Sequence, residues 1–561
     1  MKQNHPPDTS QIQGRYPDRA KRMGPSDEFD GTVPHYGAEV DGKLAWAMFK
    51  AAAAGDIALI RELIAYDPAL LNIQKWYEFP VYMAVRNGHA DVVEEMLSAG
   101  ADPGLSNYLY SSWQTLLKIA RERKFTDVLQ VLEGELTRRY NYHSDFHLLR
   151  DAIKHRDSQD VAQVLNRSPH LATSADEFGA TALHWAALTR QTSLIDHLLD
   201  SGAIIDAVRA GGCTPIHLAV RGDYWFSKER MMGRAIQHGW AVAGYLLARG
   251  ADYFLTIACG LGDRERVTAI LTDDPLAANR LDSARTSPLR AAAGEGYTDI
   301  VRDLLDAGAD PNQMEDLTIC GGPLFAASAG NHLDTARLLL ERGAQAHVGE
   351  DSSGTALSIV AHTHPESCGP MQDLLRSFGA DDEPWALSDE QISQKLDENP
   401  DSAKDPEMIK HILRSDDETL IGRLLDSSPG AFQVLSGEAV TSLPKSPAAA
   451  KRIIDAGMDI NRRDFNGSTM LWNHASKGNL EIVRLLADAG AEINVLDAME
   501  GSSPLAAAAK NGHKEMVQLL LSLGAETELA DGPWAKPASL AECSEHEDLV
   551  DLLKDRKDSS K

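Results

Sequence analysis

The chain has 561 residues and a formal net charge of -28, with 43% hydrophobic and only 6% aromatic residues. So acidic a chain disfavours a nucleic-acid partner or an anionic membrane surface, because both require a basic face. The apolar residues are mainly Ala and Leu, which favour close-packed helices over sheets. We therefore expect a helical protein that binds neither nucleic acid nor membrane.

Five cysteines are scattered along the chain without a CxxC pair. This pattern fits neither a disulfide framework nor a zinc site, and it favours a reducing compartment. The N-terminal residues lack the apolar segment of a secretory signal, and no stretch reaches the roughly 18 apolar residues of a membrane span. We expect a cytoplasmic protein with no metal or other cofactor. The sequence does not indicate its oligomeric state.

Residues 1–43 are rich in Pro, Asp and Gly and lack helical periodicity. This composition is typical of a disordered extension. The alternative is a tail that crosses a groove, in which Tyr16, Phe29 and Tyr36 would be the anchors.

From about residue 44 onwards, three short phrases recur in fixed register. One starts each unit, as in Thr181-Ala182-Leu183-His184 and Thr214-Pro215-Ile216-His217. The second is an apolar helix such as 480–486, and the third is Gly-Ala-(Asp or Glu) or a close variant after that helix. Copies of the third begin at Gly100, Gly202, Gly250, Gly308, Gly343, Gly379, Gly457, Gly490 and Gly524, and the last three are 33 and 34 residues apart.

These phrases resemble the ankyrin-repeat family, whose units have a period near 33 and a T-P-L-H-x-A start. The resemblance covers residues 44–555 and implies an all-α solenoid of about fifteen helix-turn-helix units, several of them degenerate. It also implies recognition of a folded protein partner in a concave groove lined by fingers and inner helices. In this family the His of the starting phrase hydrogen-bonds backbone between units, so His184 and His217 are interpreted as structural.

The phrases have physical reasons. Thr or Ser before the inner helix caps free N–H groups, and Pro at the next position is preset for the first turn. Gly after the outer helix is expected to adopt the left-handed conformation that ends it. Four units instead end that helix with a proline phrase, at Pro68, Pro169, Pro275 and Pro429.

The largest departure from the period lies between Gly202 and Gly250, which are 48 residues apart. An insert near residues 223–238 accounts for the excess, and the outer helix is expected to resume near Gly239. The next unit begins at Tyr253, so its finger is missing. A widened loop beside a missing finger predicts a local pocket in the groove.

Trp and Tyr are concentrated in the first half of the chain, several of them at positions expected to face the groove. With nearby arginines and carboxylates they predict a site for a small molecule or sugar. The alternative is that the rings only pack irregular units. The candidate ligand-binding residues are Trp76, Tyr77, Trp185, Arg221, Tyr224, Trp225, Arg230 and Trp240.

Two functions are compatible with these features. The favoured one is a protein-binding scaffold, because no P-loop, HExxH or nucleophile elbow is present. The alternative is a sugar-binding protein or a glycoside hydrolase, since paired carboxylates cleave glycosidic bonds. Under that alternative the catalytic pair is Glu229 with Asp223 or Asp176 facing it.

A degenerate stretch at residues 381–446 is either a hinge that divides the array or a worn repeat. The expected organisation is an N-terminal extension at 1–43, an array with the insert at 44–380, the degenerate region at 381–446, and a regular array with its cap at 447–555.

Overall fold

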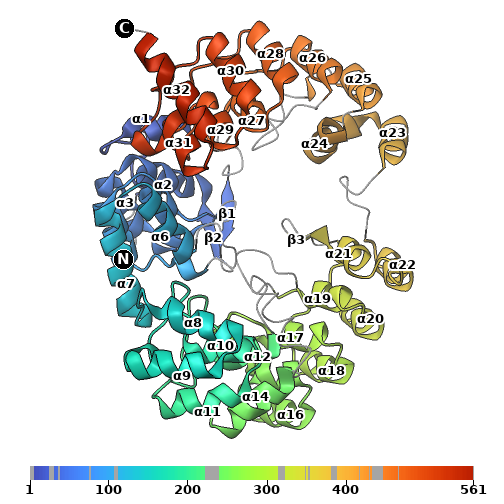
Figure 1. Cartoon of the computed structure of the whole chain (residues 1–561). Coiled ribbons are helices and arrows are strands. Elements are labelled where there is room, and N and C mark those ends of the chain that lie inside the picture. Colours follow the sequence, from blue (N-terminus) through green and yellow to red (C-terminus); the bar gives the residue numbers. More distant parts are fainter. Residues whose placement is uncertain are drawn as a thin grey trace.

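The computed structural model describes residues 5–23, 31–35, 38–74, 78–105, 112–221, 239–313, 322–347, 349–350, 354–380, 388–415, 417–428, 430–431, 446–464 and 466–559. Paired helices follow one another along a strongly curved row, with the first helix of each pair inside the curve and the second outside (Figure 1). The predicted all-α solenoid is therefore confirmed.

The row begins with a short helix and a hairpin. Helix α1 (Pro17–Arg22) lies against α2, and Tyr16 N donates to Ala54 O at 2.9 Å. Strands β1 (Thr32–His35) and β2 (Ala38–Asp41) pair antiparallel. A second, two-residue pair joins β3 (Gly349–Glu350) to β4 (Gly354–Thr355).

The helices of the first part alternate between inner and outer positions. Their bounds are α2 (Gly42–Ala54) and α3 (Ile57–Tyr66), α4 (Pro80–Arg86) and α5 (Ala90–Ser98), α6 (Trp113–Glu122) and α7 (Thr126–Tyr140), α8 (Phe146–His155) and α9 (Ser158–Arg167), α10 (Ala182–Leu188) and α11 (Thr192–Asp200), and α12 (Pro215–Arg221) and α14 (Gly239–Ala248). The expected resumption of the outer helix after the insert is confirmed by the start of α14.

The alternation continues as far as α22. The next pairs are α15 (Leu255–Leu261) and α16 (Arg264–Asp273), α17 (Pro288–Gly294) and α18 (Thr298–Asp306), α19 (Pro323–Ala329) and α20 (Leu333–Glu341), and α21 (Ala356–Thr363) and α22 (Gly369–Ser377). They are followed by α23 (Asp389–Glu398), α24 (Pro406–Ser415), α25 (Glu418–Ser427), α26 (Pro447–Asp455), α27 (Met470–Ser476), α28 (Leu480–Asp488), α29 (Pro504–Lys510), α30 (Lys514–Ser522), α31 (Pro537–Cys543) and α32 (Glu547–Ser559).

The glycine that follows an outer helix has the predicted left-handed conformation. Its φ is +110° at Gly100, +92° at Gly308 and +89° at Gly524. A Cβ at any of these three positions would meet no atom within 4 Å. Backbone conformation, and not lack of space, therefore selects glycine here.

Three of the four predicted proline phrases lie in the described residues, and each of these three ends an outer helix as predicted and forms a 3-10 turn. These turns are Pro68–Asn72 after α3, Pro169–Ala172 after α9 and Pro275–Asn279 after α16. A further turn of this kind, Pro400–Lys404, follows α23. Pro429 lies outside the described residues.

Asparagine side chains connect neighbouring fingers. The Asn279 amide donates to Gly308 O at 2.7 Å, and its oxygen accepts from Asp310 N at 2.7 Å. Asn494 makes the same two bonds to Gly524 and Glu526 of the following unit. Each such amide satisfies one donor and one acceptor of the next unit and so fixes the spacing between the two.

Histidines also connect units, and the predicted structural role of His184 is confirmed. Its Nδ1 accepts from Thr181 N at 3.1 Å, and its Nε2 lies 3.0 Å from Cys213 O of the next unit. His217 differs from the expectation, because its Nε2 lies 3.1 Å from a carboxylate oxygen of Asp282 instead of a backbone carbonyl.

A second set of histidines, not recognised from the sequence, lies at the start of outer helices. Nε2 of His89, His332 and His513 is 3.0 to 3.1 Å from a backbone carbonyl of the preceding unit. These histidines add a hydrogen bond between units outside the fingers.

Acid should weaken the array through its buried histidines. Burial lowers the pKa of His184 to about 3 and that of His89 to about 4, against about 6.5 in an unfolded chain. Between these pH values the unfolded state therefore binds more protons than the folded state. The stability that the neutral histidines contribute is fully present above the unfolded pKa and is lost as the pH falls through the folded pKa. We expect the thermal midpoint to decrease between about pH 7 and about pH 5.

The matched test compares His184→Gln with His197→Gln, since His197 is exposed. The first variant should have a lower midpoint at neutral pH and a weaker dependence on pH, whereas the second should resemble the wild type. The same pH dependence in all three proteins would contradict this prediction.

Candidate interaction surfaces

Most of the predicted ligand site lies outside the described residues, so its role stays a prediction. Arg221 ends helix α12, and its side chain also lies outside the described part. The other candidate site residues that lie outside the described part of the chain are Trp76, Tyr77, Asp223, Tyr224, Trp225, Glu229 and Arg230.

Trp185 and Asp176 contact each other in the interior. Trp185 is 2% exposed, and its Nε1 donates to Asp176 Oδ2 at 2.8 Å. Asp176 is 1% exposed and also accepts from the backbone N–H groups of Phe178 and Ala180, each at 2.9 Å. Burial, with the nearby Glu177 carboxylate, raises the pKa of Asp176 to about 6. These contacts hold a finger onto helix α10, which is a structural role.

Trp240 is 61% exposed and lies in the first turn of α14, an outer helix. It therefore belongs to a different layer from Trp185 on the inner helix α10. The structure does not bring these two predicted ligand-binding residues together on one helix layer, and their common role stays a prediction.

Other aromatic residues of the first half are packed under cations. Trp46, Tyr82 and Trp113 are buried. Lys50 lies 5.5 Å from the Trp46 ring centroid, Arg86 4.9 Å from that of Tyr82, and Arg139 5.5 Å from that of Trp113. For these three rings the packing alternative describes what is observed, with a favourable cation–π contact added.

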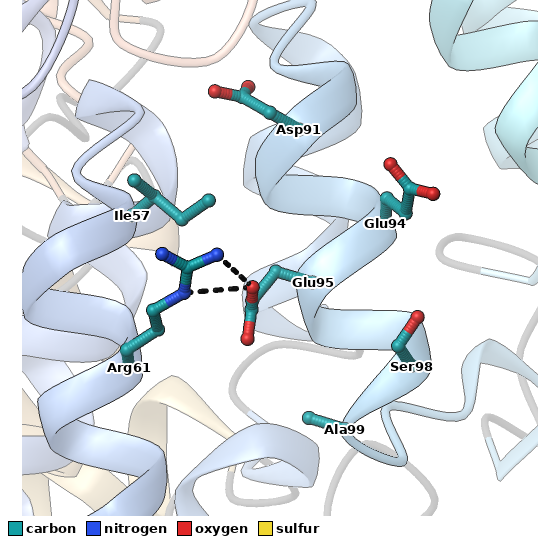
Figure 2. A pocket seen from close by; sticks show the side chains of 7 residues that line it. All are labelled: Ile57, Arg61, Asp91, Glu94, Glu95, Ser98 and Ala99. Carbon is teal, nitrogen blue, oxygen red and sulfur yellow. Dashed lines mark hydrogen bonds and ion pairs between the residues drawn. The ribbon is translucent and has the colours of Figure 1, made fainter.

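A surface depression lies between the outer helices α3 and α5 (Figure 2). Arg61 faces Glu95 across it, and its Nε and NH2 donate to one carboxylate oxygen at 2.9 and 2.6 Å. Asp91 and Glu94 add further carboxylates to its lining. The depression is thus acidic on balance, and its one arginine is already paired.

Charge is distributed unequally between the two layers of the N-terminal units. The inner helices α2, α4, α6 and α8 carry seven basic and two acidic residues. The outer helices α3, α5, α7 and α9 carry four basic and eight acidic residues. These inner helices therefore carry a net positive charge, and four of their seven cations, Arg86, Lys118, Arg121 and Arg150, pair with carboxylates.

The two ends of the row of helices meet, with α1 and α2 beside α29 and α31 (Figure 1). The carboxylate of Glu500, in the finger 495–502 before α29, lies between two arginines of the N-terminal units. Arg86 NH2 is 3.0 Å from Glu500 Oε1, and Arg123 NH2 is 2.6 Å from Oε2. Lys510 lies 3.6 Å away on the side of α29.

A second carboxylate, that of Asp531, repeats this arrangement beside α1. Arg22 NH1 is 2.6 Å and Arg19 Nε is 3.5 Å from Asp531 Oδ2. Phe125 packs edge-on against Trp534, with 4.9 Å between ring centroids.

The finger also contributes apolar side chains, because Ala498 and Met499 belong to the buried core formed by residues 23–136. We call this set the closure contact. It joins Arg19, Arg22, Arg86, Arg123 and Phe125 to Ala498, Met499, Glu500, Asp531 and Trp534.

Known proteins with the same repeat match several parts of the chain. A family model described as "Ankyrin repeats (3 copies)" matches residues 149–228 and 439–531, and one described as "Ankyrin repeat" matches 78–108 and 286–316. Together with the helix pairs, these matches define an ankyrin-type solenoid. The chain contains ankyrin repeats, and these repeats indicate a protein-interaction scaffold.

Three proteins with different names are similar to parts of this chain. A protein named as a palmitoyltransferase, ZDHHC13 of Danio rerio, is 27% identical over 172 residues, which are 25% of this chain and 26% of that protein. The ankyrin repeat protein FPV230 of fowlpox virus is 25% identical over 160 residues, 28% of this chain and 80% of that protein. The nuclear factor NF-kappa-B p105 subunit of Gallus gallus is 25% identical over 238 residues, 42% of this chain and 17% of that subunit.

The chain therefore spans about a quarter of the first relative and less than a fifth of the third. Within the described part of the chain, no helix has both the length and the apolar composition needed to cross a bilayer.

Replacing Asp176 should reveal its structural role. Asp176→Asn leaves one acceptor oxygen where the carboxylate accepts three N–H groups, so we expect a loss of about 1–3 kcal/mol in the free energy of unfolding of the surrounding units. Denaturant unfolding measures this loss. Glu177→Gln is the control, since Glu177 is partly exposed and paired with Arg150, and should cost no more than about 1 kcal/mol. Equal stability of Asp176→Asn and the wild type would contradict the assignment.

Proposed function

We propose that this scaffold binds an acidic segment of a partner protein along the inner helices of its N-terminal units. The observation that carries the proposal is the unequal charge of the two layers, with seven basic and two acidic residues on α2, α4, α6 and α8. A basic surface surrounded by an acidic one attracts and orients a negatively charged partner.

Exposed lysines give this layer cations that face solvent. Lys43 on α2 is exposed, and the Lys118 side chain on α6 is 71% exposed and lies 3.8 Å from the carboxylate of Glu122, which is also exposed. Both lie on helices whose layer is inside the curve (Figure 1). These positions favour contact with a chain segment that lies along the array.

Apolar residues on a finger favour a protein over a nucleic acid as the partner. Ile204 and Val208 are both more than half exposed in the loop between α11 and α12. The carboxylate of Asp206 in this loop accepts from Asp252 N of the next unit at 3.1 Å, which fixes the loop. Exposed aliphatic side chains on a fixed loop suit the apolar anchors of a polypeptide.

The sugar alternative has less support. Stacking on a sugar requires an open aromatic face, and of the two described candidate rings Trp185 is buried whereas Trp240 is exposed on the outer helix α14. Asp176, named for the paired carboxylates, already accepts three hydrogen bonds. The scattered cysteines favour a cytoplasmic location for the complex.

Charge reversal on the inner layer tests the proposal. We expect Lys43→Glu with Lys118→Glu to weaken binding of a fluorescent polyglutamate peptide about tenfold at low ionic strength, because two attractive cations become repulsive anions. Fluorescence anisotropy gives the dissociation constants.

The matched control reverses two exposed lysines of outer helices, Lys451→Glu and Lys514→Glu. It has the same net charge as the test variant and should bind nearly as the wild type does. An equal loss in both variants would show a response to net charge alone and would refute the proposed surface. Tighter binding of an oligonucleotide of equal charge would assign the surface to nucleic acid instead.

A further inference from the structure

We propose that the closure contact is a reversible latch, which holds the array as a ring and opens to expose its inner side. The ends of an ankyrin array ordinarily contact only their neighbouring units, because solenoid units pack in sequence order. The contact between the N-terminal units and the last fingers joins units that are far apart in sequence order, so stacking of neighbouring units does not account for it. Only the benefit of opening for partner binding rests on the proposed function.

The more deeply buried ionic part of the latch is one carboxylate that two arginines share. The side chains of Arg86 and Arg123 are 11% and 7% exposed, so both guanidinium groups are largely removed from water. The two arginines share the carboxylate of Glu500. Their positive charges, that of Arg86 above all, lower the pKa of Glu500 to about 2. Removing one partner of a buried ion pair leaves an uncompensated charge, which strongly disfavours the closed arrangement.

The finger that carries Glu500 is held in shape by its own hydrogen bonds. The carboxylate of Asp497 accepts from the backbone N–H groups of Met499 at 3.0 Å, Glu500 at 2.6 Å and Ser502 at 2.7 Å. None of these bonds crosses to the N-terminal units. Glu500 is therefore presented by a preformed loop, and the loop keeps its shape when the latch opens.

The two sides of the latch have separate cores. Apart from Ala498 and Met499, the core on one side consists of residues 23–136, and the core on the other consists of residues 392–553. Two further buried cores, of residues 146–257 and 255–380, lie between them along the chain. Opening therefore separates the first core from the last one and does not require unfolding of a unit.

Small-angle X-ray scattering of the full chain tests the latch without any partner. The test variant is Glu500→Gln with Asp531→Asn, which removes both closing carboxylates and keeps the side-chain volumes. The matched control is Glu95→Gln with Asp303→Asn. Those carboxylates also pair with arginines of a neighbouring unit, Arg61 and Arg264, but on outer helices.

We expect the wild type and the control to have the dimensions of the closed ring. The test variant should have a larger radius of gyration and maximum dimension, with unchanged helix content by circular dichroism. Unchanged dimensions with full helix content would overturn the latch, and so would an open wild type. If the test variant loses helix content, the same scattering measurement on Trp534→Ala decides whether the latch exists. It removes the contact with Phe125 without leaving a charge unpaired, and a closed Trp534→Ala protein would also overturn the proposal.

Binding of the polyglutamate peptide separates the two proposals. An open variant that binds the peptide more tightly than the charge-matched control supports both. An open variant with unchanged binding supports the latch and contradicts the benefit for the proposed function. A closed variant contradicts the latch, whichever affinity it has.

Discussion

The hydrogen bonds between neighbouring units determine the shape on which the other features depend. Each asparagine of the type of Asn279 links two fingers at one edge of the array, and each histidine of the type of His89 links two units where an outer helix begins. With both places fixed, a unit has one orientation relative to the next, and a small rotation per unit accumulates into a curve. That accumulated curve brings Glu500 within reach of Arg86 and Arg123.

The local features of the fold could be predicted, because each depends on a few adjacent residues. Gly308 ends a helix through its own φ, Pro169 stops a helix by its ring, and His184 bonds within reach of its own helix. Trp185 shows the limit of such reasoning. Its position in the repeat indicated a groove-facing ring, but Asp176 and Lys154 enclose it. A repeat pattern predicts which face of a helix a residue occupies. It does not predict which side chains of neighbouring units cover that face.

The closure contact could not have been found in this way. Glu500 belongs to one of the regular units, and no phrase around it differs in kind from the phrases of other fingers. Its partners lie 414 and 377 positions earlier in the chain. Their proximity depends on the summed rotation of all the units between them, which no short sequence window contains.

Closure also limits how such a chain can evolve. An open solenoid tolerates duplication or loss of a unit, since each unit contacts only its neighbours and the new end is as free as the old one. In a ring, one unit more or fewer between Arg123 and Glu500 would rotate the finger away from its arginines and leave their charges without a counter-ion. The number of repeats is then fixed by geometry, as it is in a closed β-propeller, and the irregular lengths of individual units become the remaining means of adjusting the fit.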